Sequence, residues 1–266
     1  MRFLYRYYDR LEFVIDVIVN KRLYFSLPNE FNDPFDCRPK FSLHFCKNDP
    51  EEVWRRYFYI LAKYQYRNIS DIEAQKHAYA AILRRKHKDN VWLRQADEEI
   101  KKTLNEQVNH FRICCFSKSP RNPMMWAHYA NNHKGVVLQF KISDMLNHES
   151  GTYRGFNVEY YPRPIPLRRY VEAMEYTLEG DPLAFVRLIY CSKSEEWVGE
   201  KEVRFFSRST FVPFQKKTLS GILFGSECPV YWEHTIQNLL SKCDLKPKVF
   251  KEDGLISSVK LCFNGA

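Results

Sequence analysis

The sequence has few glycines and no long apolar run. Only 9 of its 266 residues are glycine, while 45% are apolar and 27% are charged. This composition excludes a collagen-like chain and disfavours intrinsic disorder. The longest apolar runs, such as 136–138 and 222–224, are far too short to span a membrane. The first residues, Met1 to Arg6, contain neither the apolar stretch nor the cleavage site of a secretory signal. We therefore expect a cytoplasmic protein with no membrane partner.

Several common functional motifs are also missing. The chain contains no dinucleotide-binding G-x-G-x-x-G, no phosphate-binding P-loop, no G-x-S-x-G nucleophile turn and no H-E-x-x-H zinc motif. Its 8 cysteines form no Cys-x-x-Cys pair, which disfavours zinc and redox sites. His128 and His133 would lie about 140° apart on a helix, which argues against a shared metal. We expect no metal site.

The charge balance is basic. The chain has 41 Lys and Arg residues against 32 Asp and Glu residues, a formal charge of +9, and 16% of its residues are aromatic. Positive charge supplies most of the sequence-independent affinity for nucleic acid, and aromatic rings stack on bases. Many basic proteins bind no nucleic acid, so the charge indicates this partner without establishing it.

The order of the elements predicts an α+β protein. Short strands are expected at 3–7, 22–26, 111–116, 136–140, 157–161, 202–206 and 219–224, with two more near the C-terminus at 248–250 and 256–263. Their uneven alternation with helices favours short, mostly antiparallel strands in two small sheets around a cleft. Residues 50–110 have helical periodicity, and Ser70 with Glu73 fits a capping box. We therefore expect one domain over residues 1–266 that contains a helical insertion at 50–110.

The first candidate cluster joins Tyr5-Arg6-Tyr7 to the loop at 31–36, which contains Asn32 and Asp33. The guanidinium of Arg6 is suited to a phosphate or a carboxylate. Alternatively, Arg6 forms a structural ion pair with Asp33 or Asp36.

The second candidate cluster follows Ser117. Trp126, Tyr129 and His133 stand at i, i+3 and i+7, so a helix through residue 132 would present all three rings on one face. Such rings could stack on nicotinamide or adenine. They are also ordinary core residues whose polar ends find backbone partners.

The third candidate cluster lies at 200–206. On a strand, Glu200, Glu202 and Arg204 would share one face, while Val203 and Phe205 would enter the core. Two carboxylates beside an arginine could hold a sugar hydroxyl or stabilise a developing cation. The alternative is an exposed strand face with a cross-strand ion pair.

Together these motifs resemble a bacterial family called domain of unknown function 2971. The resemblance rests on residues 5–7, the Phe25-Ser26-x-Pro28 lead into the loop at 31–36, Cys115-Phe116-Ser117, the motif from Met125 to Gly135, and Trp197-x-x-Glu200-x-Glu202-x-Arg204. It extends from residue 5 to about 206 and leaves out the helical block. The family name implies no activity.

A second resemblance is to ADP-ribosyltransferases, including the DarT-like toxins. Those enzymes carry Arg or His on a first strand, Ser or Tyr on a middle strand and Glu late in the fold, and Arg6, Ser117 and Glu202 follow this order. The resemblance implies NAD as the substrate, with Glu202 as the catalytic residue and Glu200 positioning the acceptor. Arg6, Ser117 and the neighbouring residues of the first two clusters would then bind NAD: Tyr5, Asn32, Asp33, Trp126, Tyr129 and His133.

The same resemblance, with the basic charge, implies RNA or DNA as the acceptor. Such an enzyme would be a toxin of a toxin-antitoxin or phage-defence system, held in check by an antitoxin protein. Two alternatives stay open. A metal-dependent nuclease would use Asp33, Asp36, His133 and Glu202, and a non-catalytic module for nucleic acid or a protein partner would use the basic helices at 50–110.

Overall fold

The computed structural model describes residues 3–33, 35–37, 41–108, 111–141, 155–162, 165–252 and 259–261. It confirms the α+β class. The chain forms two compact units, whereas the sequence predicted one domain with an insertion. The first unit consists of residues 1–30, 111–158 and 196–266, and the second of 31–110 and 159–195. Among the described residues, no helix combines the length and hydropathy that a membrane crossing requires.

The first unit is built on an eight-stranded sheet, with the order β12-β11-β10-β4-β1-β3-β8-β5. All its neighbouring strands are antiparallel except β10 and β11, so the expected antiparallel character is confirmed. Instead of two small sheets around a cleft, the structure has this one large sheet and two separate two-stranded ribbons. The strands are β1 (Phe3–Tyr8), β3 (Arg112–Ser117), β4 (Val136–Lys141), β5 (Gly155–Asn157), β8 (Glu202–Ser207), β10 (Leu219–Phe224), β11 (Lys248–Glu252) and β12 (Val259–Leu261).

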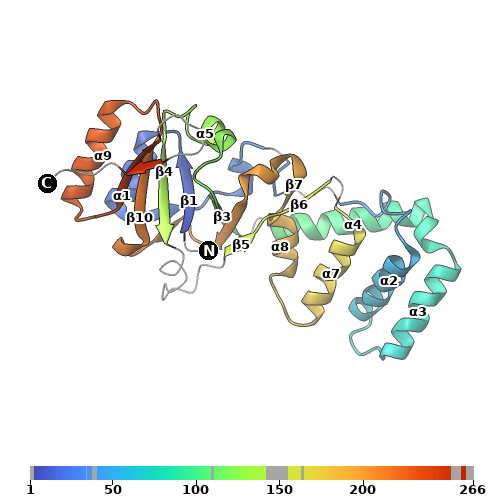
Figure 1. Ribbon diagram of the computed structural model, residues 1–266. Coiled ribbons are helices and arrows are strands. Elements are labelled where there is room, and N and C mark those ends of the chain that lie inside the picture. The colour runs from blue at the N-terminus through green and yellow to red at the C-terminus, as the bar shows by residue number, and fades with distance from the viewer. Residues whose placement is uncertain are drawn as a thin grey trace. The chain divides into compact units, whose positions relative to one another are not determined.

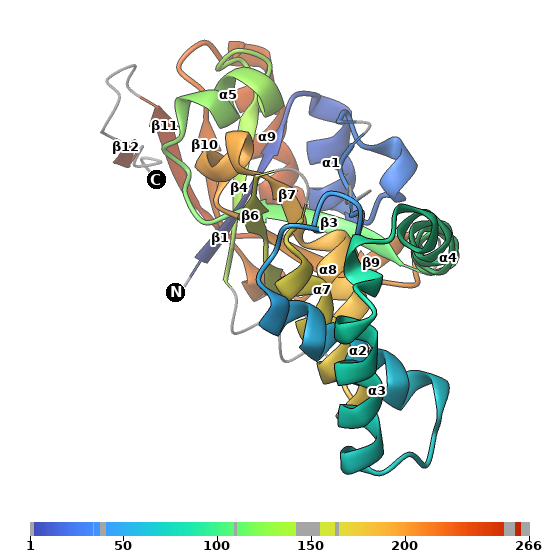
Figure 2. The same cartoon turned by 90° about the vertical axis from the view of Figure 1, so that its right-hand side faces the viewer.

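The two faces of this sheet are covered differently. One face carries the main core, to which α1 (Leu11–Asn20) contributes Val14 and Ile18, and α9 (Val230–Lys242) contributes Ile236. On the opposite face, α5 (Pro123–Tyr129) packs Trp126 against Tyr7. Figure 1 and Figure 2 show the ribbons of these helices beside the sheet. A short ribbon of β2 (Arg22–Tyr24) and β9 (Phe211–Pro213) completes the regular strands of this unit. The 3-10 turns are η1 (Pro28–Glu30), η3 (Glu195–Glu200) and η4 (Lys216–Thr218).

The second unit is mainly helical. Its helices are α2 (Glu51–Gln65), α3 (Asp71–Leu83), α4 (Asn90–Val108), α7 (Leu167–Leu178) and α8 (Ala184–Tyr190), with the 3-10 turn η2 (Lys86–Lys88) and a parallel ribbon of β6 (Glu159–Tyr161) and β7 (Ser192–Ser194). The predicted capping box is present: Ser70 and Glu73 bond to each other's backbone N–H groups at the start of α3. The predicted helical block at 50–110 is therefore helical, and residues 159–195 pack with it in the same unit.

Three element boundaries differ from the sequence predictions. The predicted strand at 157–161 is two strands, β5 and β6, which belong to different units. The predicted helix through residue 132 ends at Tyr129, because the three residues 131–133 take left-handed backbone angles. Of the last predicted strand, 256–263, the described part is β12, and its remainder lies outside the described residues.

Candidate active site on one face of the sheet

A row of polar residues crosses the sheet face that carries α5. Tyr5 on β1 lies directly opposite Ser117 on β3, and Ser117 lies opposite Glu202 on β8. Residues that face each other across strands project from the same side of a sheet. On the other side of Tyr5 the row continues through Gln139 on β4 to Gly221 on β10. The structure therefore brings together Tyr5, Ser117 and Glu202, which the sequence spreads over almost 200 positions.

Arg6 projects from the opposite face. It stands between Leu4 and Tyr8, which belong to the main core. Its Nη1 donates a hydrogen bond to the carbonyl of Tyr24 at 3.0 Å and also contacts the thiol of Cys114. The expected single pocket containing both Arg6 and Glu202 is therefore not formed. The reason is the period of two along β1, which separates Arg6 from its neighbours Tyr5 and Tyr7.

Glu202 and Arg204 form a buried ion pair along β8. The carboxylate oxygens of Glu202 accept from Nε of Arg204 at 2.9 Å and from Nη2 at 2.8 Å. The side chain of Arg204 is 0% exposed, and that of Glu202 is 7% exposed. The alternative of an exposed strand face is wrong, because β8 is buried along its length, and this ion pair lies within one strand. Val203 and Phe205 enter the main core, as predicted.

Glu200 lies just before β8, at the end of η3. The intervening Lys201 has a left-handed backbone with φ 48°, so Glu200 does not continue the strand alternation. The hydroxyl of Tyr129 donates to Oε1 of Glu200 at 2.8 Å, and the hydroxyl of Ser117 donates to its backbone carbonyl at 2.7 Å. Both carboxylates are buried, and each is held by a residue from the predicted clusters.

Aromatic side chains of α5 pack on this face of the sheet. The helix begins at Pro123, and the side chain of the preceding Asn122 accepts from the N–H of Met124 at 3.0 Å, which is a favourable N-cap. Trp126 meets Tyr7 edge-on, with their centroids 5.4 Å apart, and its indole N–H donates to the carbonyl of Pro120. Burial raises the pKa of Tyr7. Trp126 is thus a core residue with a satisfied polar end, whereas Tyr129 is half-buried and contacts Glu200.

His133 reaches this face from beyond the helix. Its imidazole stacks on the indole of Trp126, with centroids 5.8 Å apart and ring planes 10° apart. Its Nδ1 lies 2.8 Å from Oε2 of Glu252 at the end of β11. The predicted grouping of Trp126, Tyr129 and His133 exists in space, although the helix that was expected to carry all three ends at Tyr129.

Asn32 and Asp33 belong to the second unit. The side chain of Asn32 accepts from the N–H of Asp33 at 3.0 Å, and the side chain of Asp33 accepts from the N–H of Phe35 at 2.8 Å. Bonds of this kind, from Asn and Asp side chains to nearby backbone, are typical of turns. In the same unit, Asp36 forms a buried ion pair with Lys193, at 3.4 Å. The site described above consists of residues of the first unit.

Sequence reasoning missed two residues near this site. Glu252 is 119 positions from His133, and nothing in its local sequence marks it. Arg121 is exposed and lies close enough to Tyr5 to oppose the rise in pKa that burial causes in that tyrosine. Arg121 therefore places a positive charge beside the row on the face from which Arg6 is absent.

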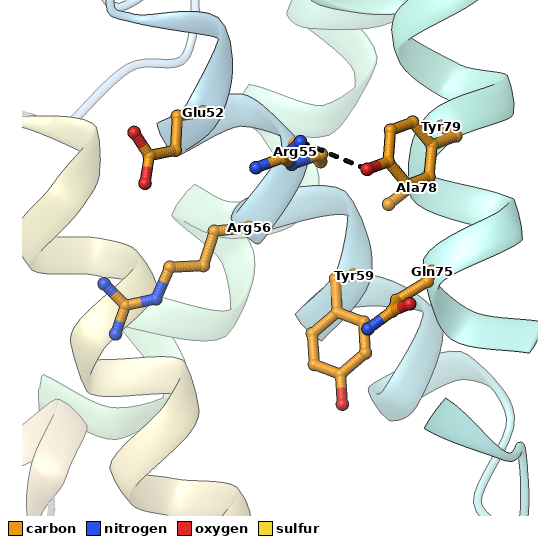
Figure 3. Close-up of a pocket in the computed structure, with 7 residues that line it drawn as sticks. All are labelled: Glu52, Arg55, Arg56, Tyr59, Gln75, Ala78 and Tyr79. Atoms are coloured by element: carbon orange, nitrogen blue, oxygen red, sulfur yellow. Dashed lines mark hydrogen bonds between the residues drawn. The ribbon is translucent and has the colours of Figure 1, made fainter. Parts of the chain in front are cut away.

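The second unit has a groove between α2 and α3, with a volume of about 330 Å³. In Figure 3 the guanidinium of Arg55 points toward Tyr79, whose hydroxyl accepts from it at 3.3 Å. Arg56 points toward α7, where it pairs with Glu175. Tyr79 is 52% exposed, and Arg55 is exposed beside it. The remaining residues of the groove are Glu52, Tyr59, Gln75 and Ala78.

Comparison with known proteins finds one match, which includes residues of both units. Residues 125–205 match the model of a family described as a protein of unknown function, DUF2971. This part of the chain is therefore similar to the DUF2971 family. This segment contains Trp126, Tyr129, His133, Glu200 and Glu202, while Tyr5 and Ser117 precede it. No curated protein and no solved structure matches the chain.

Proposed function

We propose that this protein is an NAD-dependent ADP-ribosyltransferase whose site is the α5 face of the first unit. The observation that carries the proposal is the row formed by Tyr5, Ser117 and Glu202 on three adjacent strands. A first-strand residue, a middle-strand serine and a late glutamate are the positions that the resemblance to this enzyme fold implies. In this version of the site Tyr5 takes the place expected for Arg6.

Cleavage of NAD requires a negative charge beside the ribose. Cleavage of the bond between nicotinamide and ribose passes through a transition state that resembles an oxocarbenium ion. A fixed carboxylate stabilises that positive charge, which develops only during the reaction. Glu202 is the catalytic residue of this proposal, and Glu200, held by Tyr129, positions the acceptor.

The residues on this face are of the kinds that NAD requires. Tyr129 and His133 offer partly accessible rings beside the buried indole of Trp126. Arg121 supplies a cation near Tyr5 for the pyrophosphate, a role that Arg6 cannot fill from the opposite face. NAD would then lie along α5, with its ribose toward Ser117 and Glu202.

The proposed acceptor is RNA or DNA. The support is the net charge of +9 and the groove of the second unit, where Arg55 and Tyr79 offer a cation and a ring side by side. This pairing suits a phosphate and a stacked base. With this acceptor, the protein would be a cytoplasmic toxin of a toxin-antitoxin or phage-defence system. An antitoxin protein would restrain its activity.

The same groove favours a second candidate, a non-catalytic nucleic-acid-binding module. Its binding would weaken steeply with salt and would survive loss of Glu202. For the nuclease alternative, the described residues contain no group of three or more His, Cys, Asp or Glu side chains placed to hold a metal ion.

The test is to incubate the protein with labelled NAD and RNA or DNA, and to follow nicotinamide release and label transfer. We expect Glu202→Gln to lower both by at least about 100-fold, which is typical for loss of a charge-stabilising group. Glu196→Gln is the matched control, because Glu196 is an exposed carboxylate in the same 3-10 turn as Glu200. Full transfer by a folded Glu202→Gln variant would contradict the proposal. Binding without any NAD turnover would favour the second candidate.

A further inference from the structure

His133 and Glu252 form a second titratable pair on the α5 face. Oε2 of Glu252 lies 2.8 Å from Nδ1 of the imidazole and also accepts from the N–H of Ser226 at 3.3 Å. A carboxylate at Nδ1 favours the tautomer with its proton there, which leaves the lone pair on Nε2. Nε2 makes no hydrogen bond to any described residue, and the side chain of His133 is 32% exposed. The imidazole is therefore oriented by its partner and accessible at the other nitrogen.

The backbone that carries His133 is held in an unfavourable conformation. Asn131, Asn132 and His133 have φ values of 47°, 52° and 65°, a left-handed run of three residues that all carry a Cβ. Asparagine and histidine both tolerate this region better than most residues, but it is usually visited by single residues and not by a run of three. Strained backbone of this kind persists where the surroundings fix it, and it is concentrated at functional sites.

The surroundings of this turn do fix it. The carbonyl of His133 accepts from the N–H of Glu227 at 3.0 Å, and the N–H of Gly225 donates to Gly135 at 3.0 Å. A Cβ on Gly225 would stand 2.0 Å from the carbonyl oxygen of His133, so glycine is required for this approach. Several specific backbone contacts thus hold the imidazole against Trp126.

The helix α5 connects this pair to the carboxylates of the proposed active site. Trp126, on which His133 stacks, is one turn before Tyr129, which donates to Glu200. One turn of a helix rises about 5 Å. The imidazole and Glu200 therefore contact two rings that are neighbours on one face of α5.

From this geometry we infer that His133 is the general base for the acceptor, with Glu252 as its positioning residue. This inference rests on the proposed transferase function and deepens it. As the nucleophilic oxygen or nitrogen of the nucleic acid bonds to C1′ of the ribose, its proton passes to Nε2 of His133. The electron pair of the broken C1′–N bond leaves with nicotinamide, which departs as a neutral molecule.

The test compares His133→Gln and Glu252→Gln with His128→Gln, which removes an exposed histidine from α5. Label transfer and acceptor-free nicotinamide release are measured from pH 5 to 9. We expect His133→Gln to lower transfer by about 100-fold or more, as for loss of a general base, and to abolish the acid limb of the pH profile. Nicotinamide release without acceptor should fall less than label transfer does, since that reaction removes no proton from the nucleic acid.

Glu252→Gln should retain more transfer than His133→Gln, because the imidazole keeps its reactive nitrogen and loses only the carboxylate that orients it. Besides Glu252 from β11, the titratable group close to this pair is Tyr7 from β1, which interacts electrostatically with Glu252. Lys134 is exposed beside His133.

The two possible failures are distinguishable. If the wild type releases no nicotinamide under any condition, the proposed function is wrong, and this inference falls with it. If the wild type is active but His133→Gln transfers label within about 3-fold of it at every pH, the inference alone is overturned and His133 only packs against Trp126.

Discussion

The ion pair of Glu202 and Arg204 leads to a prediction about the free energy of unfolding, which can be measured separately from catalysis. Both hydrogen bonds of the pair are short, at 2.9 and 2.8 Å, and the guanidinium is fully buried. In Glu202→Gln the buried guanidinium of Arg204 would lose the carboxylate that balances its charge in this pair. Breaking a buried pair from one side costs about 3–5 kcal/mol. With an m value of about 2 kcal/mol per molar urea, the unfolding midpoint should fall by about 2 M.

The double variant Glu202→Gln/Arg204→Met should recover most of this loss, because it removes the buried charge along with its partner and keeps an apolar side chain of similar length. Urea unfolding followed by tryptophan fluorescence measures both effects. Asp244→Asn is a suitable control, because it breaks an exposed ion pair with Lys216. Loss of such a pair should leave the urea midpoint unchanged. A loss below about 1 kcal/mol for Glu202→Gln, with no recovery in the double variant, would refute the reasoning. Activity of Glu202→Gln must be measured well below its own midpoint.

Three further predictions concern other residues. Tyr129→Phe leaves an oxygen of the buried Glu200 without its donor, so we expect a loss of about 1–3 kcal/mol in urea unfolding; a smaller change would show that another group satisfies that oxygen. Gly135→Ala would place a Cβ 2.1 Å from the carbonyl oxygen of Tyr8, and a loss of at least about 1–3 kcal/mol is expected in the same assay. Burial lowers the pKa of His87, whose Nδ1 has no hydrogen-bond partner among the described residues. Because the unfolded chain then binds a proton more readily, stability should fall as the pH drops below about 6.5, and His87→Phe should lose that part of the pH dependence of thermal unfolding.

Much of the local structure could be read from the sequence. Periodicity located the helices and most strands, and the residue pattern at 70–73 predicted a capping box that is present. Alternation along 202–206 correctly placed Glu202 and Arg204 on the face opposite Val203 and Phe205. These features depend on residues that are close in the chain, so a window of ten or twenty residues contains their causes.

The functional face could not be read in this way. Alternation along β1 places Arg6 on one face of the sheet and Tyr5 and Tyr7 on the other. It does not show which of these two faces also carries Glu202. That was decided by the pairing of β1 with β3 and of β3 with β8, and by α1 and α9 covering one face while α5 covers the other. Likewise, the left-handed turn at 131–133 brings His133 to Glu252 through contacts with residues 225–227. The sequence by itself determined the elements and the residues with chemical potential. The tertiary structure decided which of them share a site, because strand pairing and sheet covering join residues that are more than a hundred positions apart.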